Sequence, residues 1–288
     1  MLIQNGQMRN NQQVARRFIK HRLAVGGLVI MVVILFLAVF APFVTLYDPI
    51  KVDLRAIRKP PDSNHWLGTD LIGRDVWSRI VYGGRISMGV GLGAVTIYVV
   101  IGSFLGALAG YFGGVIDGVV MRITEIFLTL PSLLVVIVFV SVVGPSVATV
   151  ITVIGLLGWP QTARIVRGQV LGLREEDYVI AARMIGASTG RIITRHMLPN
   201  MAGALTVAAT FGVATAVILE ASLSFLGLGV QPPTPSWGGM LNDAHSPTVL
   251  VGAPWLWLSP GIAIAVTVLS VNFIGDGLTD AFDPHYEK

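Results

Sequence analysis

The sequence predicts an all-α polytopic membrane protein with six transmembrane helices. Apolar residues make up 53% of the 288 residues, charged residues only 12%, and the mean hydropathy is +0.74. A soluble domain would have roughly a quarter of its residues charged. The charges are clustered, which leaves uncharged stretches of the length, about 20 residues, that a membrane helix needs. In lipid, only helices and closed β-barrels satisfy the hydrogen bonds of the backbone. The stretches lack the period-two alternation of barrel strands, so we expect helices.

The first uncharged stretch, Leu23–Leu46, predicts an anchor helix over residues 23–47. Its 24 residues cover about 36 Å at the helical rise, enough for a hydrocarbon core of about 30 Å. A basic tail, residues 1–22, precedes it. A signal peptide would have an apolar region of about 7–15 residues before a cleavage site of small residues. This stretch is longer and ends in Ala41-Pro42, so we expect an uncleaved anchor.

An external loop over residues 48–85 is expected next, followed by a five-helix transport domain over 86–288. Gly144-Pro145 is a turn signal between the third and fourth helices of the chain. In the second helix, Gly102, Gly106 and Gly110 form a stripe of small residues that allows another helix to approach closely. The five helices are expected at Ile86–Gly110, Val115–Val143, Ser146–Ile165, Met201–Leu226 and Leu256–Ile274.

The basic residues favour an arrangement with both termini in the cytoplasm. Six spans put the N-terminal tail on the same side as six arginines between residues 164 and 195, and cytoplasmic segments are enriched in Lys and Arg. The loop 48–85 opposes this, with seven basic residues against five aspartates. We keep the N-inside arrangement because the first span usually dominates. Since the basic residues lie beside apolar spans, the pI of 9.6 indicates contact with the lipid bilayer and not with nucleic acid.

The polar segment Asp177–Asn200 between two apolar stretches is the main functional signal. Asp177 lies where acids favour the start of a helix. Ala182 and Gly186 would share one helix face, because they are four residues apart, and would offer a partner a nearly side-chain-free surface. Ser188 can cap a second short helix carrying Arg191, and Pro199 would end that helix or start the next. The expected result is a protruding elbow over 172–200. The alternative is an interfacial amphipathic helix on anionic lipid.

The spacing Ala181-Ala182-x3-Gly186-x9-His196-x-Leu198-Pro199 resembles the EAA loop of ATP-binding-cassette importer permeases, which docks on the ATPase. Further stretches resemble the dipeptide/oligopeptide/nickel permease family, C-subunit type, and together with the loop cover nearly the whole chain from Leu23. The matching stretches are His65–Asp70, Gly73–Asp75, Ser78-Arg79, Gly84–Ser87, Ala109–Gly114 with Asp117, Leu130–Ser132, Leu223–Gly229, Pro232–Gly238 and Gly275–Pro284.

This resemblance implies a type I importer permease fold with a cytoplasmic coupling loop over 172–200. It also implies four kinds of partner: a homologous B-type permease, two ATPase subunits, an extracytoplasmic solute-binding protein, and the bilayer of a bacterial inner membrane. ATP and Mg²⁺ would be bound by the partner ATPases, with no cofactor in this chain. The residues implied to dock on the ATPase are Asp177, Ala181, Ala182, Gly186, Arg191, His196 and Pro199.

Three positions depart from the pattern of the superfamily or family. Ile180 stands where the broader superfamily has glutamate, and Asp177 is the candidate to supply the acidic contact instead. His196 replaces an isoleucine that many members have. Thr279 stands where the family usually has arginine, so an ion pair is not available there.

No catalytic or metal site is expected in this chain. Gly186–Gly190 matches G-x-S-x-G, but that motif works as a nucleophile elbow only in a strand-turn-helix setting. None of the four lysines follows a glycine, which excludes a phosphate-binding P-loop. The five histidines are scattered without metal-ligand spacing, and the chain has no cysteine.

Two features of the outer half remain as candidates. Glu220 lies within the fifth apolar stretch, where an acid is a functional candidate by default; it would line the translocation path or hydrogen-bond to another helix. The segment 227–254 has no lysine or arginine but contains Pro233 and Trp237. These two residues are candidate contacts of the binding protein, and a shallow helical re-entry is the alternative use of the segment.

The hypothesis that follows is a permease subunit of an ATP-driven importer, with a secondary transporter or an intramembrane enzyme as less favoured classes. A secondary transporter usually shows internal repeats, and we find none here. An intramembrane enzyme would need a nucleophile, base or metal constellation, which is missing. Dipeptides or oligopeptides are the leading cargo, and nickel or a metal chelate is the alternative.

Overall fold

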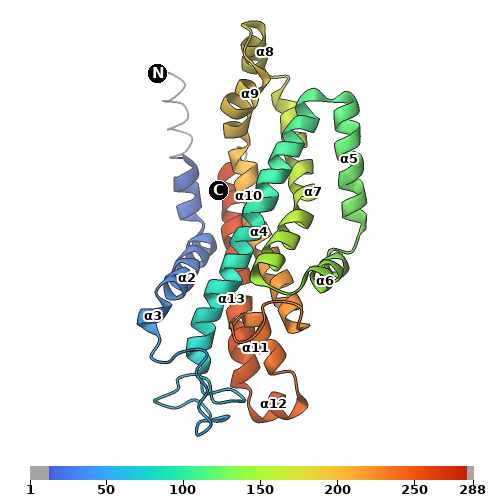
Figure 1. Cartoon of the computed structure of the whole chain (residues 1–288). Coiled ribbons are helices and arrows are strands. Elements are labelled where there is room, and N and C mark those ends of the chain that lie inside the picture. Colours follow the sequence, from blue (N-terminus) through green and yellow to red (C-terminus); the bar gives the residue numbers. More distant parts are fainter. Residues whose placement is uncertain (1–12, 284–288) are drawn as a thin grey trace.

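The computed structural model describes residues 13–283 (Figure 1), and these residues fold into a helical bundle. Within this range the sole β pairing is an isolated bridge between Thr69 and Asp75. Five helices are long and apolar enough to cross a membrane, and a bent pair makes a sixth span. The long helices are α2 (Arg22–Val39), α4 (Val76–Phe112), α5 (Gly114–Thr129), α6 (Ser132–Val143), α7 (Val147–Leu173), α10 (Leu198–Phe225) and α13 (Trp255–Phe282). The short ones are α3 (Ala41–Val44), α8 (Asp177–Met184), α9 (Thr189–Arg191), η1 (Ile192–Met197), α11 (Trp237–Asp243) and α12 (Pro247–Gly252).

Helix α4 begins ten residues before the start that the sequence predicted for this span. Asp75 caps it, accepting a hydrogen bond from the Ser78 backbone N–H at 2.8 Å. The prediction assigned residues 76–85 to the external loop because Arg79, Arg85 and two adjacent glycines interrupt the apolar pattern there. The 37 residues of α4 measure about 55 Å at the helical rise, so the helix extends beyond a hydrocarbon core of about 30 Å.

The third predicted span is two helices, not one. α5 and α6 meet at an angle of 89° between Thr129 and Ser132. Pro131 lacks the backbone N–H that would continue the helix, and its ring disfavours helical geometry at Leu130. Leu130 is accordingly extended, with φ −83° and ψ 134°. The bend makes a broken span on one side of the bundle (Figure 1).

The glycine stripe of α4 packs against α7, as the small-residue pattern predicts. A Cβ on Gly102 would lie 2.6 Å from the Thr162 Cβ, and one on Gly110 would lie 2.8 Å from the Val170 Cβ. Gly106 faces Ala163 in the same row. Since no side chain larger than hydrogen fits at these three positions, the stripe sets the close approach of the two helices.

The elbow and the two described ends of the chain lie toward the same end of the bundle, whereas loop 48–75, α11 and α12 lie at the other (Figure 1). The Arg17 Nη1 atom donates a hydrogen bond to the Asp283 carbonyl oxygen at 2.6 Å, which joins the two described ends. Residues 1–12 of the predicted basic tail lie outside the described residues.

Candidate functional site

The predicted elbow is folded against the start of α10. Val179 and Ala182 of α8 pack with Ile192, Met197 and Met201, and all five residues are buried. This small core anchors α8, so that the elbow is a compact extension of the bundle and not a loose loop. It is the topmost feature of the molecule in Figure 1.

Helix α8 ends in a Schellman motif, which corrects the expected shared face of Ala182 and Gly186. The Ala187 N–H bonds to the Ala182 carbonyl, and the Gly186 N–H bonds to the Arg183 carbonyl, both at 3.0 Å. Gly186 has φ +78°, a left-handed conformation that favours glycine. Because the helix stops at Met184, Gly186 does not continue its face, and Ala182 points into the elbow core with 7% exposure.

The second helix of the elbow is not a separate short helix, because it continues into the fifth span. Residues Thr189–Phe225 form one helical run, with the π-helical turn η1 within it. Ser188 occupies the N-cap position but makes no capping hydrogen bond with its side chain. The wide turn ends directly before Pro199, which starts α10, and a π turn accommodates a residue that lacks the N–H of the helical ladder.

An apolar pair is exposed at the tip of the elbow. Met184 and Ile185 are 84% and 86% exposed. Two arginines of the elbow are exposed as well, Arg183 directly before Met184 in the sequence and Arg191 in α9. Of the other predicted docking residues, Asp177, Ala181, Gly186 and Pro199 are exposed as well. An exposed apolar knob with cationic neighbours is a surface suited to a partner groove.

Two contacts brace the elbow on the end of α4. The Arg183 guanidinium carbon lies 5.4 Å from the centre of the Tyr111 ring, within cation–π range. The Arg174 Nη1 atom donates to the Gly110 carbonyl oxygen at 3.2 Å. The elbow is therefore fixed to α4 as well as to α10.

His196 is half-buried and has a place within the elbow. Its ring centre lies 6.5 Å from that of Tyr178. The Asn200 Nδ2 atom donates to the His196 carbonyl oxygen at 2.6 Å and to the Tyr178 Oη atom at 3.2 Å. Partial burial, together with the nearby Glu176 carboxylate, raises the pKa of the Tyr178 phenol, so this acceptor stays neutral at physiological pH. The Asn200 side chain thereby links α10 to Tyr178 of α8.

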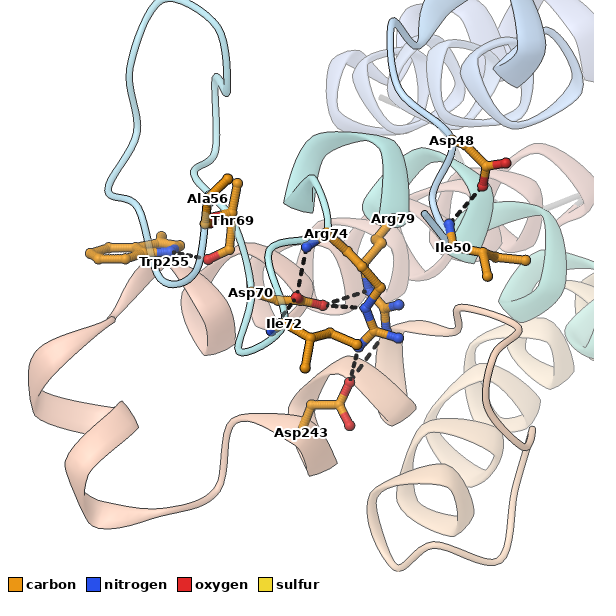
Figure 2. Close-up of polar contacts among 10 residues, drawn as sticks. All are labelled: Asp48, Ile50, Ala56, Thr69, Asp70, Ile72, Arg74, Arg79, Asp243 and Trp255. Atoms are coloured by element: carbon orange, nitrogen blue, oxygen red, sulfur yellow. Dashed lines mark hydrogen bonds and ion pairs between the residues drawn. The ribbon is translucent and has the colours of Figure 1, made fainter. Parts of the chain in front are cut away.

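A charge network at the opposite end joins the loop before α4 to α11 (Figure 2). The Asp70 Oδ2 atom lies 2.6 Å from the Arg74 Nε atom and 3.6 Å from the Arg79 Nε atom. The Asp243 Oδ2 atom of α11 pairs with both arginines, at 3.2 and 3.3 Å. Asp70, Arg74 and Arg79 lie in the stretches that carried the family resemblance. Asp243 lies outside them, and no sequence pattern indicated that it would complete the network.

Glu220 does not line the main cavity described below and is fully buried. Its Oε2 atom accepts from the Ser87 hydroxyl at 2.9 Å, and its Oε1 atom accepts from the Ser224 hydroxyl at 2.8 Å. Ser87 belongs to α4 and Ser224 to α10. The structure therefore gives Glu220 the alternative role considered above, a hydrogen-bonded link between two helices.

Trp237 is also buried, which corrects its assignment as an external contact. It is 2% exposed in a cluster with Met31 and Met88, and its Nε1 atom donates to the Ile80 carbonyl oxygen at 2.9 Å. Pro233 remains exposed. Between Trp237 and Trp255 the chain forms α11 and α12, and α11 packs against α10 and α13.

The main cavity runs along α10 and has a volume of about 1400 Å³. α7 forms a second wall, and the break between α5 and α6 contributes Leu130 and Ser132. The lining of α10 extends from Pro199, at the elbow, to Leu219. Twenty residues of helix correspond to about 30 Å, so the cavity reaches from the elbow deep into the membrane-spanning part.

Sequence reasoning did not identify this cavity or its polar residues. Gln161 and Gln169 of α7 and Thr206 and Thr215 of α10 line it. The sequence did contain one signal for the cavity. Gln161 lies within the fourth apolar stretch and Gln169 lies just beyond it, at helical spacing. An amide at such a position costs free energy unless it faces protein or water, so the pair indicated a polar surface on this helix.

Comparisons with known proteins show which family this chain resembles. Residues 102–288 match the family described as "Binding-protein-dependent transport system inner membrane component", and residues 11–61 match the "N-terminal TM domain of oligopeptide transport permease C". A putative peptide permease protein of Brucella suis is 45% identical over 273 residues, covering 95% of this chain and 90% of the relative. The dipeptide transport system permease protein DppC of Bacillus subtilis is 44% identical over 277 residues, covering 96% and 86%.

A solved structure has the same fold at low sequence identity. One chain of the MetNI methionine ABC transporter, in an inward-facing conformation, superposes with a TM-score of 0.57 at 20% identity. The match covers 72% of this chain and 98% of that one. At this identity the likeness shows the fold alone, that of a type I importer permease.

The bundle, the elbow and the cavity define a membrane-embedded transport subunit that acts with separate ATPase and solute-binding partners. The chain belongs to the binding-protein-dependent transport system inner membrane component family. It is a permease subunit of an ABC importer in the inner membrane, and ATP hydrolysis resides in other subunits.

Proposed function

We propose that this chain forms half of a translocation pathway for dipeptides or oligopeptides and that its elbow is driven by an ATPase. The observation that carries this proposal is the continuity of one helical run. Residues 189–225 begin in the elbow and continue as the wall of the main cavity. A displacement of the elbow is therefore transmitted along a rigid helix to the cargo pathway.

The proposed cargo follows from the relatives and from the side chains of this chain. The two relatives above are named as peptide and dipeptide permeases, and one matching family description names oligopeptide transport. Neither these names nor the family descriptions mention nickel. Over residues 13–283, no group of three or more His, Cys, Asp or Glu side chains is arranged to hold a metal ion. Peptide is therefore the cargo that we favour over nickel or a metal chelate.

The proposed assembly contains one copy of this chain, one homologous B-type permease and two ATPase subunits, with a solute-binding protein docking reversibly outside. ATP and Mg²⁺ would be bound by the ATPases and not by this chain. The elbow and both termini would face the cytoplasm, because the ATPases are there. Pro233, which is exposed at the opposite end, is the remaining candidate contact of the binding protein.

A charge introduced at the apolar tip of the elbow tests whether the elbow docks on the ATPase. Replacing Ile185 by glutamate places a charge at a position that is 86% exposed, so folding should be unaffected. In a hydrophobic groove of the ATPase the same charge would be buried without a partner, at a cost of several kcal/mol. We expect I185E to insert normally but to lose copurification of the ATPase and ATP-driven peptide uptake. The matched control is Leu54→Glu, because Leu54 is 73% exposed in the loop before α4, outside both the elbow and the membrane-spanning helices. Full uptake by I185E would contradict the docking assignment.

A further inference from the structure

The cavity wall has almost no charge, although the proposed cargo has charged termini. Among the described residues that line the cavity, Asp283 is the one member of the Asp, Glu, Lys, Arg and His group. It follows the last residue of α13. The rest of the wall is apolar or has hydroxyl and amide groups. Apart from Asp283, the described part of the wall offers no charged side chain that could pair with the termini or side chains of the cargo.

The polar groups of the wall are instead suited to amides. Gln161 and Gln169 are exposed on one face of α7, two turns apart and separated by Ile165, which also lines the cavity. Within residues 13–283 neither glutamine side chain makes a hydrogen bond. Each amide therefore has two N–H donors and a carbonyl acceptor available. A peptide group has one N–H donor and one carbonyl acceptor, and a glutamine amide can pair with both.

The opposite wall supplies acceptors. The Thr206 hydroxyl donates to the Ala202 carbonyl at 2.7 Å, and the Thr215 hydroxyl donates to the Phe211 carbonyl at 3.1 Å. Because each hydroxyl hydrogen is used within α10, the lone pairs of both oxygens remain to accept from a cargo N–H.

The spacing of the glutamines fits a short extended peptide. Eight residues of helix place Gln161 and Gln169 about 12 Å apart, which is the length of three to four residues in an extended chain. We infer that Gln161 and Gln169 read the peptide backbone of the cargo during translocation, and that cargo side chains of either charge are accepted. This inference rests on the proposed peptide cargo.

The test uses the complete transporter, with the second permease, the ATPases and the binding protein, reconstituted in liposomes. Gln161→Met with Gln169→Met removes both amides at nearly constant volume. For trialanine we expect uptake kcat/KM to fall by about tenfold, since each lost hydrogen bond is worth a factor of a few. Leu156→Met is the matched control, because Leu156 is exposed on α7 but does not line the cavity, and this variant should match the wild type. The loss should be much smaller for trialanine methylated on its backbone nitrogens, which has fewer backbone donors.

A second variant tests whether the cavity accepts cargo of either charge because its wall has almost no charge. It keeps a polar group at the substituted position. Gln169→Glu adds a fixed charge, and it should raise the uptake of a lysine-containing tripeptide relative to a glutamate-containing one. The wild type should take up both at similar rates. Wild-type uptake of trialanine by the double methionine variant, or an unchanged lysine-to-glutamate ratio in Q169E, would overturn the inference. A wild-type transporter that imports another solute but no peptide would instead overturn the proposed function.

Discussion

At the residue scale, the ring of Tyr98 occupies a slot formed by two glycines on different helices. A Cβ on Gly158 of α7 would lie 2.6 Å from the Tyr98 Cδ1 atom, and a Cβ on Gly212 of α10 would coincide with the Tyr98 hydroxyl. Tyr98 itself belongs to α4 and is 7% exposed. One aromatic ring therefore sets the spacing of three helices, two of which form the cavity walls.

We predict that Gly212→Ala destabilises the protein by about 1–3 kcal/mol, because the added methyl group overpacks the slot. The melting midpoint of the purified protein in detergent measures this. Gly261→Ala is the control, since its Cβ would meet no atom within 4 Å in α13, and there alanine should be neutral or stabilising. Equal midpoints for G212A and the wild type would show that the ring does not occupy the slot.

At the scale of elements, the network in Figure 2 holds the loop before α4 against α11. Arg79 is 4% exposed, and Asp70 is its buried partner. Asp70→Asn keeps an oxygen for the backbone N–H groups of Ile72 and Arg74 but removes the charge. We expect D70N to cost about 3–5 kcal/mol, the usual result of leaving a buried charge short of its partner.

Asp243→Asn should cost less, because the Asp243 side chain is 39% exposed and water can replace it. Melting midpoints and trypsin cleavage at Arg55 or Arg58 in the loop measure both variants. Asp62→Asn is a control outside the network and should have little effect. Hydrogen bonds from the backbone N–H groups of His65 and Asn64 hold the pKa of the exposed Asp62 carboxyl below its usual value. The oxygen of the asparagine amide can accept the same two bonds. A larger effect of D243N than of D70N would contradict the assigned roles.

The long membrane-spanning helices were predictable from the sequence, but the positions where these helices begin, bend or end were harder to predict. The apolar stretches gave the spans because each must satisfy its backbone within lipid. The start of α4 was missed because Arg79 and Arg85 looked like loop charges, whereas Arg79 pairs with Asp70 of the preceding loop and with Asp243 of the distant helix α11. The end of α8 in the elbow depends on the left-handed conformation of Gly186, which periodicity alone does not reveal. Trp237 was taken as an external contact because its burial depends on long-range packing, whereas for Glu220 the structure shows the hydrogen-bonded alternative.

At the scale of the whole molecule, the orientation can be tested directly because the chain contains no cysteine. Ser63 and Ser188 are both exposed, at opposite ends of the bundle, so labelling depends on the side of the membrane and not on burial. We expect a cysteine at Ser63 to react with an impermeant thiol reagent in intact cells, and one at Ser188 to react only after the membrane is opened. Labelling of the Ser188 cysteine in intact cells would place the elbow outside, away from the ATPases.

The cavity also predicts that this chain cannot form a closed pathway alone. Its polar side chains, Gln161 and Gln169 among them, would face lipid if the walls of α7 and α10 were left uncovered. Each polar group without a partner in hydrocarbon costs several kcal/mol, so a second protein surface must cover them. We expect that surface to be a homologous B-type permease. Reconstitution of this chain with the ATPases and the binding protein should give no ATP-dependent uptake, and addition of the second permease should restore it. Uptake by the mixture without that permease would show that two copies of this chain enclose the pathway between them.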